Sequence, residues 1–82
     1  MNLYGSHLCP DVIYAITVLK SKGIDFSFVN VSADLGSLKA FIKIRESSPL
    51  FDNVRACDGI GIPCFEKDNG EITLDINDII GK

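Results

Sequence analysis

The segment from Pro10 to Gly23 constrains the fold more than any other part of the sequence. Its apolar residues recur at spacings of three and four, which places them on one face of a helix; they are Val12, Ile13, Ile16 and Leu19. Pro10 suits the first helical turn because its missing N–H has no intrahelical partner there. Gly23 follows two nearby lysines and is a natural C-terminal cap. We therefore expect a helix that begins at Pro10 and ends just before Gly23.

The rest of the chain alternates between strand and helix patterns. Short strands are predicted at residues 2–4, 26–31, 62–65 and 71–74, and Asp68-Asn69-Gly70 is a hairpin turn signal between the last two. A second helix is expected from an N-cap at Ser32 or Asp34 up to Pro49, which ends it. A loop through Asp52, Asn53 and Cys57 to Gly59 follows, and residues 76–80 predict a brief last helix.

The order β-α-β-α-β-β-α predicts an α/β fold. We expect a four-stranded mixed sheet, because the final hairpin adds an antiparallel pair, with flanking helices that cover one sheet face. A chain of 82 residues makes a single domain, 1–82.

Charge, hydropathy and the number of cysteines limit the classes of partner and the cellular compartment that we expect. The formal net charge of −3 argues against nucleic-acid binding through bulk electrostatics. No apolar run approaches the roughly 18 residues that span a bilayer, so we expect no membrane partner and a cytoplasmic location. We also expect a monomer. Three cysteines are an odd number, which argues against a complete disulfide framework. In a reducing compartment a cysteine is more often buried, catalytic or metal-binding than bridged.

Cys9 lies directly before the predicted helix. The free N–H groups and the dipole at a helix N-terminus stabilise a thiolate, which is the attacking species in disulfide exchange. The alternative is a buried cysteine that acts as a small apolar residue. The position alone does not decide between these two interpretations.

Two segments carry a resemblance to a known family. Tyr4-Gly5-Ser6-His7-Leu8-Cys9-Pro10 is similar to the active-site segment of glutaredoxins, in which Cys-Pro-x-Cys follows the first strand. Gly61-Ile62-Pro63-Cys64-Phe65 resembles the thioredoxin-fold segment whose cis-proline faces the active-site cysteine. The chain resembles the short bacterial glutaredoxin-related proteins over nearly its whole length.

The resemblance implies a thioredoxin-like fold with Cys9 as the catalytic thiol and glutathione as co-substrate. It implies a glutathione or substrate site formed by His7, Pro10, Ile62, Pro63 and Asp75. The backbone of Ile62, beside a cis-Pro63, would pair with an extended substrate peptide.

Two of these residues have a second interpretation. His7 could support the thiolate or a glutathione carboxylate, or be a loop histidine without a role. Asp75, like Asp78, could accept from the glutathione ammonium or serve as a helix cap and a solvated charge.

The sequence departs from the family pattern at the second active-site cysteine. Val12 stands at that position and cannot resolve a mixed disulfide, so the resemblance implies a monothiol route in which glutathione resolves it. The Gly-Gly segment that is common near the last helix of glutaredoxins is also absent.

Other residues have open roles. Cys57 could act as a surrogate resolving thiol, and Cys64 is expected to be buried. Arg45 and Arg55 are candidate carboxylate clamps, although Arg45 could instead cap its helix.

Three functions fit these features. The first is a glutathione-dependent thiol–disulfide oxidoreductase that reduces glutathione or protein mixed disulfides. The second is a glutathione-assisted iron–sulfur module, although Cys9-Pro10-Asp11-Val12 differs at three positions from the usual Cys-Gly-Phe-Ser. The third is a redox-inert adaptor that binds a partner through the Pro63 edge. A single histidine and no closely spaced Cys/His set give no reason to expect a resident metal.

Overall fold

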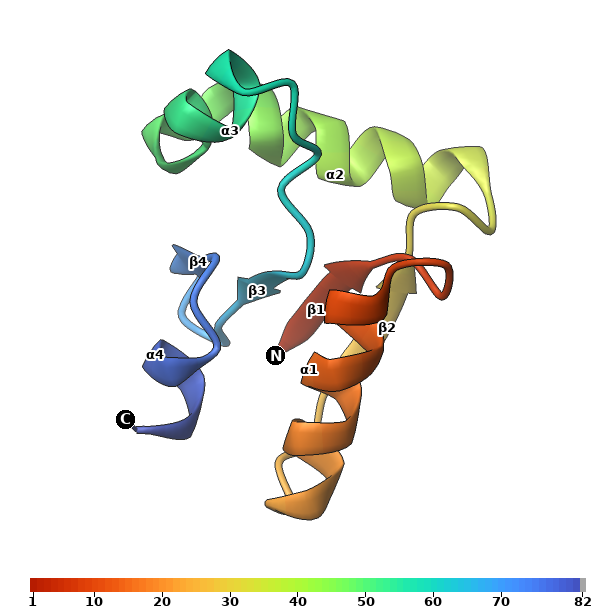
Figure 1. The fold of residues 1–82 in the computed structure, drawn as a ribbon, viewed down its shortest axis with the longest axis vertical. Coiled ribbons are helices and arrows are strands. Elements are labelled where there is room, and N and C mark those ends of the chain that lie inside the picture. Colours follow the sequence, from red (N-terminus) through yellow and green to blue (C-terminus); the bar gives the residue numbers. More distant parts are fainter. Residues whose placement is uncertain (82) are drawn as a thin grey trace.

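The computed structural model describes residues 1–81, whose strands and helices alternate along most of the chain (Figure 1). The strands are β1 (Asn2–Gly5), β2 (Ser27–Asn30), β3 (Cys64–Glu66) and β4 (Ile72–Thr73). The helices are α1 (Pro10–Ser21), α2 (Leu35–Ser47), α3 (Asp52–Ala56) and α4 (Asn77–Ile80), with a 3-10 turn at Pro49–Phe51. Among residues 1–81, no helix has both the length and the apolar character required to cross a membrane.

The four strands form one mixed sheet in the order β2-β1-β3-β4, which confirms the predicted α/β class and mixed sheet. β1 runs parallel to β2, from the pair Asn2 and Ser27 to the pair Gly5 and Asn30. β3 is antiparallel to both β1 and β4. Because β1 and β2 are parallel, their carboxyl ends lie at the same sheet edge, and the loop that leads to Cys9 leaves the sheet there.

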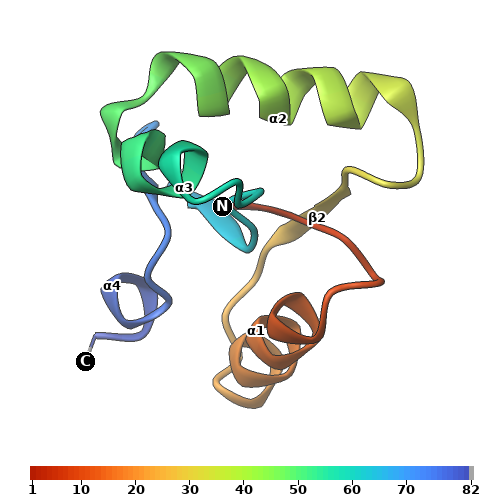
Figure 2. The same ribbon diagram turned by 45° about the horizontal axis from the view of Figure 1, so that its top comes forward.

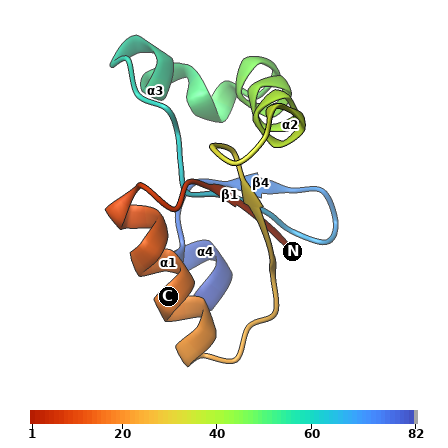
Figure 3. The same ribbon diagram turned by 90° about the vertical axis from the view of Figure 1, so that its right-hand side faces the viewer.

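Helices cover both faces of the sheet, so the expectation that they cover one face is wrong. Figure 2 shows α2 on one side and α1 with α4 on the other, and Figure 3 places α3 on the side of α2. The physical reason lies in the strands, where successive side chains point to opposite faces. Leu3 and Tyr4 are both buried and adjacent in β1, yet they belong to different apolar clusters.

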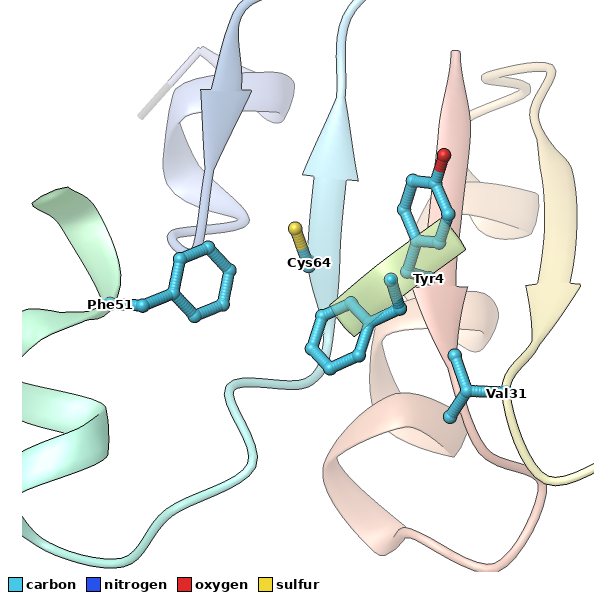
Figure 4. Packing of buried hydrophobic residues seen from close by; sticks show 5 residues of the cluster. Tyr4, Val31, Phe51 and Cys64 are labelled. Carbon is cyan, nitrogen blue, oxygen red and sulfur yellow. The ribbon is translucent and has the colours of Figure 1, made fainter. Parts of the chain in front are cut away.

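Each face therefore has its own core. The α1-side cluster consists of Leu3, Ala15, Leu19 and Phe65. The α2-side cluster consists of Tyr4, Val31, Phe41, Phe51 and Cys64. Figure 4 shows Tyr4 and Cys64 on neighbouring strands of the α2-side cluster, with Phe51 and Val31 on either side of them.

The ends of the two long helices follow the sequence signals. α1 has Cys9 as its N-cap and Pro10 in its first turn. Gly23, at a φ of 68°, follows it and donates its N–H to the Lys20 carbonyl. The side chain of Asp34 accepts from the Ser37 N–H at 2.7 Å, so Asp34 rather than Ser32 is the cap of α2.

The loop predicted through Asp52 and Asn53 is instead the short helix α3, which is a second correction. Pro49 ends α2 as expected, but the chain turns back into helical geometry because the Ser48 hydroxyl accepts from the Leu50 N–H. The fully buried Phe51 then anchors this turn in the α2-side cluster.

The last two strands are shorter than predicted. β3 begins at Cys64 rather than Ile62, because the ladder with β1 starts only after Pro63, which has no N–H to contribute. The predicted hairpin turn is confirmed, since Gly70 donates its N–H to the Lys67 carbonyl at 2.9 Å.

Candidate functional site

Cys9 lies at the junction between the sheet edge and the N-terminus of α1. Its backbone is extended, its carbonyl accepts from the Val12 and Ile13 N–H groups at 3.1 Å each, and its own N–H donates to the Ser6 carbonyl. The thiol is partly exposed and makes no capping hydrogen bond to the helix. Cys9 therefore lies, partly exposed, at the N-terminal end of the α1 dipole, which is the end that favours a negative charge.

A chain of hydrogen bonds ties the Cys9 loop to the end of β2. The Ser6 hydroxyl accepts from the Leu8 N–H at 3.1 Å and lies 2.8 Å from the Ser32 hydroxyl. Ser32 donates its single hydroxyl proton to the Asn30 side-chain oxygen at 2.8 Å. The Ser6 hydroxyl must therefore donate to Ser32, and the resulting chain fixes the loop just before Cys9.

His7 belongs to the same polar network. The Asn30 side-chain oxygen is occupied by Ser32, so its amide nitrogen faces His7 and lies 2.9 Å from Nδ1. An amide nitrogen only donates, so Nδ1 accepts and the proton of the imidazole is on Nε2. In this arrangement the Nδ1 atom of His7 is committed to Asn30, so His7 serves to hold the loop rather than to contact Cys9.

Cys9 shares a pocket with the segment that precedes Pro63. This pocket, of about 440 Å³, is lined by Ser6, Leu8, Cys9, Ile60, Gly61 and Ile62. A second pocket of about 490 Å³ shares Ser6, Ile60 and Ile62 with it and is also lined by Val31, Ser32, Leu38, Phe41, Ile42 and Arg45. We call the two together the Cys9 groove. It runs from the thiol along the 60–62 segment to α2.

Some of the predicted site residues line the Cys9 groove and others do not. Cys9 and Ile62 line the groove, and the peptide bond from Ile62 to Pro63 is cis, as the resemblance implied. Pro10 occupies the exposed first position of α1. Asp75 is not among the groove residues, and its carboxylate accepts from the Asn77 N–H at 2.9 Å, a capping contact at the start of α4.

Arg45 has a different role from the two that the sequence suggested. Its Nη2 donates to the Gly59 carbonyl at 2.7 Å, and its Nε donates to the Ile60 carbonyl at 3.0 Å. The guanidinium is therefore neither a free carboxylate clamp nor a cap of its own helix. It fastens the 59–60 segment, one wall of the groove, to α2.

The close approach of Gly61 to Phe51 also fixes the position of this wall of the groove. Gly61 has a φ of 95°, and a β-carbon there would lie 2.5 Å from Phe51 Cε2. Only glycine fits this close approach, because the aromatic ring is fully buried and the backbone angle disfavours other residues. Arg55, the other candidate clamp, lies away from the groove and donates to the Arg45 carbonyl and to Asp52.

Comparison with known proteins identifies a relative. A protein of Haemophilus influenzae (strain ATCC 51907 / DSM 11121 / KW20 / Rd), described as an uncharacterized protein, is 36% identical over 75 residues, which cover 92% of this chain and 87% of the relative. The two chains belong to one family. The relative's description names no activity, ligand or partner. No model of a known protein family matches the chain, and no solved structure does.

The other two cysteines are separate from the groove. Cys64 is fully buried, as predicted, and this burial, with a smaller effect of the Glu66 carboxylate, raises the pKa of its thiol to about 12. Cys57 is exposed at the end of α3 and does not line the groove. Val12 is fully buried in the first turn of α1.

Sequence reasoning missed Leu8 and Ile60, the two apolar side chains that line the groove with Cys9. It also missed the hydrogen bonds by which Arg45 holds the 59–60 segment. Leu8 and Ile60 lie in loops that are far apart in the sequence, so no periodicity links them. The only signal was an apolar residue in each of two otherwise turn-like segments. The contacts of Arg45 with Gly59 and Ile60 depend on how α2 packs and have no sequence signature.

Proposed function

We propose that this protein is a thiol–disulfide oxidoreductase with a thioredoxin-like fold, in which Cys9 acts by a monothiol mechanism. Glutathione is the resolving thiol, and the cytoplasm, where thiols are kept reduced, is the compartment. One observation carries the proposal: Cys9 at the N-terminus of α1 and Ile62, just before Pro63, line one groove.

The sheet supports the fold assignment. A β-α-β unit places β1 beside β2 in parallel, and the β3–β4 hairpin extends the sheet antiparallel to β1. Helices pack on both faces, and the candidate nucleophile follows the first strand. The mixed four-stranded sheet, with Cys9 following its first strand, agrees with the thioredoxin-like fold that the resemblance to glutaredoxins implies.

The chemistry is a series of disulfide exchanges at Cys9. The Cys9 thiolate attacks one sulfur of a glutathione mixed disulfide or a protein disulfide, so an S–S bond to Cys9 forms while the original S–S bond breaks. The displaced thiolate takes up a proton. With a glutathione mixed disulfide attacked at its glutathione sulfur, one glutathione thiolate then attacks the glutathione sulfur on Cys9, so that glutathione disulfide forms and the Cys9 thiolate is restored. With a protein disulfide, a first glutathione thiolate attacks the Cys9 sulfur and releases the protein thiolate, and a second restores Cys9. Two glutathione thiols then supply the two electrons and leave as glutathione disulfide.

The surroundings of Cys9 support a resolving thiol from outside the protein. Val12 at the second cysteine position is buried and carries no thiol. Cys64 is fully buried, and Cys57 lies outside the groove lining. Of the described residues that line the groove, Cys9 alone has a thiol.

The backbone of Ile62 supports an extended substrate. Ile62 lies outside the ladder of β1 and β3, and within residues 1–81 its N–H and C=O groups form no hydrogen bond to another backbone group. Unpaired backbone groups at the rim of a groove can bind an extended peptide as an added strand.

The test is glutathione-dependent reduction of a glutathionylated peptide by the wild-type protein and by Cys9→Ser. Cys57→Ser is the matched control, because it removes an exposed thiol outside the groove. Turnover that disappears in Cys9→Ser and persists in Cys57→Ser supports the proposal. Turnover that survives in Cys9→Ser, or its absence in the wild type, refutes it.

A further inference from the structure

We infer that the Cys9 groove binds the polypeptide half of a disulfide, an extended segment with apolar side chains beside its cysteine, and does not bind glutathione itself. This inference rests on the proposed function of Cys9. It adds the substrate class and assigns glutathione to the role of a thiol that attacks from solution.

The rim of the groove is apolar on both sides of Cys9. Leu8 comes directly before the thiol and is 75% exposed, and Ile60 on the opposite wall is 60% exposed. Ile42 of α2 is 45% exposed and continues the apolar surface away from Cys9. Apolar side chains gathered around a groove mark a surface that a ligand or partner covers.

The charges in the groove do not suit glutathione. Glutathione has two carboxylates and one ammonium group at neutral pH, and buried or half-buried charges require partners. Of the described residues that line the groove, Arg45 is the only charged one. Its guanidinium is already bonded to the Gly59 and Ile60 carbonyls and paired with Glu46.

The side-chain hydroxyls of the groove are already hydrogen-bonded as well. The Ser6 and Ser32 hydroxyls bind each other, and Ser32 also donates to Asn30. An apolar side chain needs none of these groups, and burying it against Leu8, Ile60 and Ile42 is favourable.

The backbone of Ile62 indicates a polypeptide rather than another apolar ligand. Ile62 lines the groove, and its N–H and C=O groups have no backbone partner within residues 1–81. An extended segment bonded to them presents alternate side chains to the groove. One of these would lie between Leu8 and Ile60 when the cysteine of the segment reaches Cys9.

Reduction of the bound disulfide then takes three thiol–disulfide exchanges at Cys9. The Cys9 thiolate attacks the sulfur of the peptide cysteine, a Cys9–peptide S–S bond forms, and the other half of the disulfide leaves as a thiolate. Glutathione from solution then attacks the Cys9 sulfur and releases the peptide as a thiolate that takes up a proton. A second glutathione frees Cys9 and leaves as glutathione disulfide.

The test uses three probes activated as 2-thiopyridyl disulfides: a cysteine peptide flanked by leucines, the same peptide flanked by serines, and glutathione. Attack by Cys9 forms the mixed disulfide and releases thiopyridone, whose absorbance gives the rate. All proteins in this test carry Cys57→Ser, which removes the exposed second thiol, so that the probes react with Cys9 and not with Cys57. Each rate is divided by the rate of free cysteine with the same probe.

We expect the leucine-flanked peptide to react about tenfold faster than either of the other two probes, the size of preference that one apolar contact provides. Ile60→Ser should remove most of that preference. Leu35→Ser should keep it, because it deletes an aliphatic side chain that is also largely exposed, 71% against 60% for Ile60, but lies outside the groove.

The outcomes separate the inference from the proposed function. Fast reaction of Cys9 with all three probes, or fastest reaction with the glutathione probe, overturns the inference and leaves the proposed function standing. Reaction with every probe at the rate of an ordinary cysteine overturns both. An unchanged preference in Ile60→Ser overturns the assignment of the apolar contact.

Discussion

A β-carbon on Gly5, the last residue of β1, would lie 2.6 Å from Cγ1 of Val12 in the first turn of α1. The end of the strand and the start of the helix are therefore in direct contact through a glycine and a fully buried valine. Cys9 lies between them in the chain, so this contact helps to set the position of the candidate nucleophile. Val12 fills a packed site at the position where glutaredoxins, which the sequence resembles, have a thiol.

Gly5→Ala should destabilise the fold by about 1–3 kcal/mol, because the added methyl group overpacks against Val12. Val12→Ala should also destabilise it, since it leaves a cavity. The double variant should lose less than the sum, with a coupling of about 0.5–3 kcal/mol, because each change relieves the other. Urea unfolding of the four proteins measures this cycle, and strictly additive losses would contradict the contact.

Gly61→Ala should lower the free energy of unfolding more than Gly70→Ala does. Both glycines have a positive φ, 95° and 88°, so both substitutions carry backbone strain of about 1–2 kcal/mol. A β-carbon at Gly61 also meets the ring of Phe51, whereas nothing lies within 4 Å of one at Gly70. We expect an additional loss of about 1–3 kcal/mol at Gly61 from this overlap. Equal losses in urea unfolding would show that Phe51 does not constrain the segment.

Arg45→Lys should loosen the wall of the groove although it keeps the charge. The planar guanidinium reaches the Gly59 and Ile60 carbonyls together, and an ammonium group cannot reproduce that fork. Each hydrogen bond from a charged group contributes about 1.5–3 kcal/mol, so the loss should be measurable in urea unfolding. Lys43→Gln on the exposed part of α2 is the control and should leave stability unchanged. The selectivity of Cys9 among disulfide probes should fall in Arg45→Lys and not in Lys43→Gln.

The free energy of unfolding should decrease as the pH rises above about 9, because Cys64 keeps its proton only in the folded protein. Its pKa is raised from an ordinary 9.0 to about 12. Below pH 9.0 both states carry this proton and stability does not depend on it. Between these values the unfolded chain alone releases the proton, so stability falls by up to about 1.4 kcal/mol per pH unit.

Cys64→Ala should remove this part of the pH dependence. Burial also raises the pKa of Tyr4, with the Glu66 charge adding to the effect, so part of the decline should persist at still higher pH until Tyr4→Phe removes it. Urea unfolding from about pH 8 to about pH 11 measures both contributions. An equally steep decline in Cys64→Ala would exclude Cys64 as its source.

The sequence predicted those parts of the fold that depend on local patterns. The helix after Cys9 and the mixed sheet followed from periodicity, turn residues and caps, which act within a few neighbouring residues. The five residues of α3 are too few for a periodic pattern, and they are held by Phe51 and Ser48 through contacts that only the folded chain provides. Whether helices pack on one sheet face or on both depends on which side chains of each strand point to which face. Strands of two to four residues are too short for the sequence pattern to predict this.

The candidate site likewise has features that the sequence predicts and features that depend on tertiary packing. The importance of Cys9 could be predicted from its place before a helix, and its proximity to Ile62 came from the resemblance rather than from any spacing. The fastening of Gly59 and Ile60 by Arg45 joins residues 14 and 15 positions apart across two elements. Such a contact depends on tertiary packing, which is why Arg45 was mistaken for a clamp or a cap.

The two walls of the Cys9 groove are anchored in opposite layers of the molecule. Cys9 is the N-cap of α1, whose buried residues Ala15 and Leu19 pack in the α1-side cluster. The 59–62 wall is held instead by α2 and by Phe51 of the α2-side cluster. The sheet separates the layer that supports Cys9 from the layer that supports the 59–62 wall. Under the proposed function, substitutions in α2 and the 59–62 segment would change which disulfides bind and leave the support of Cys9 intact, so the two halves of the groove could diverge independently.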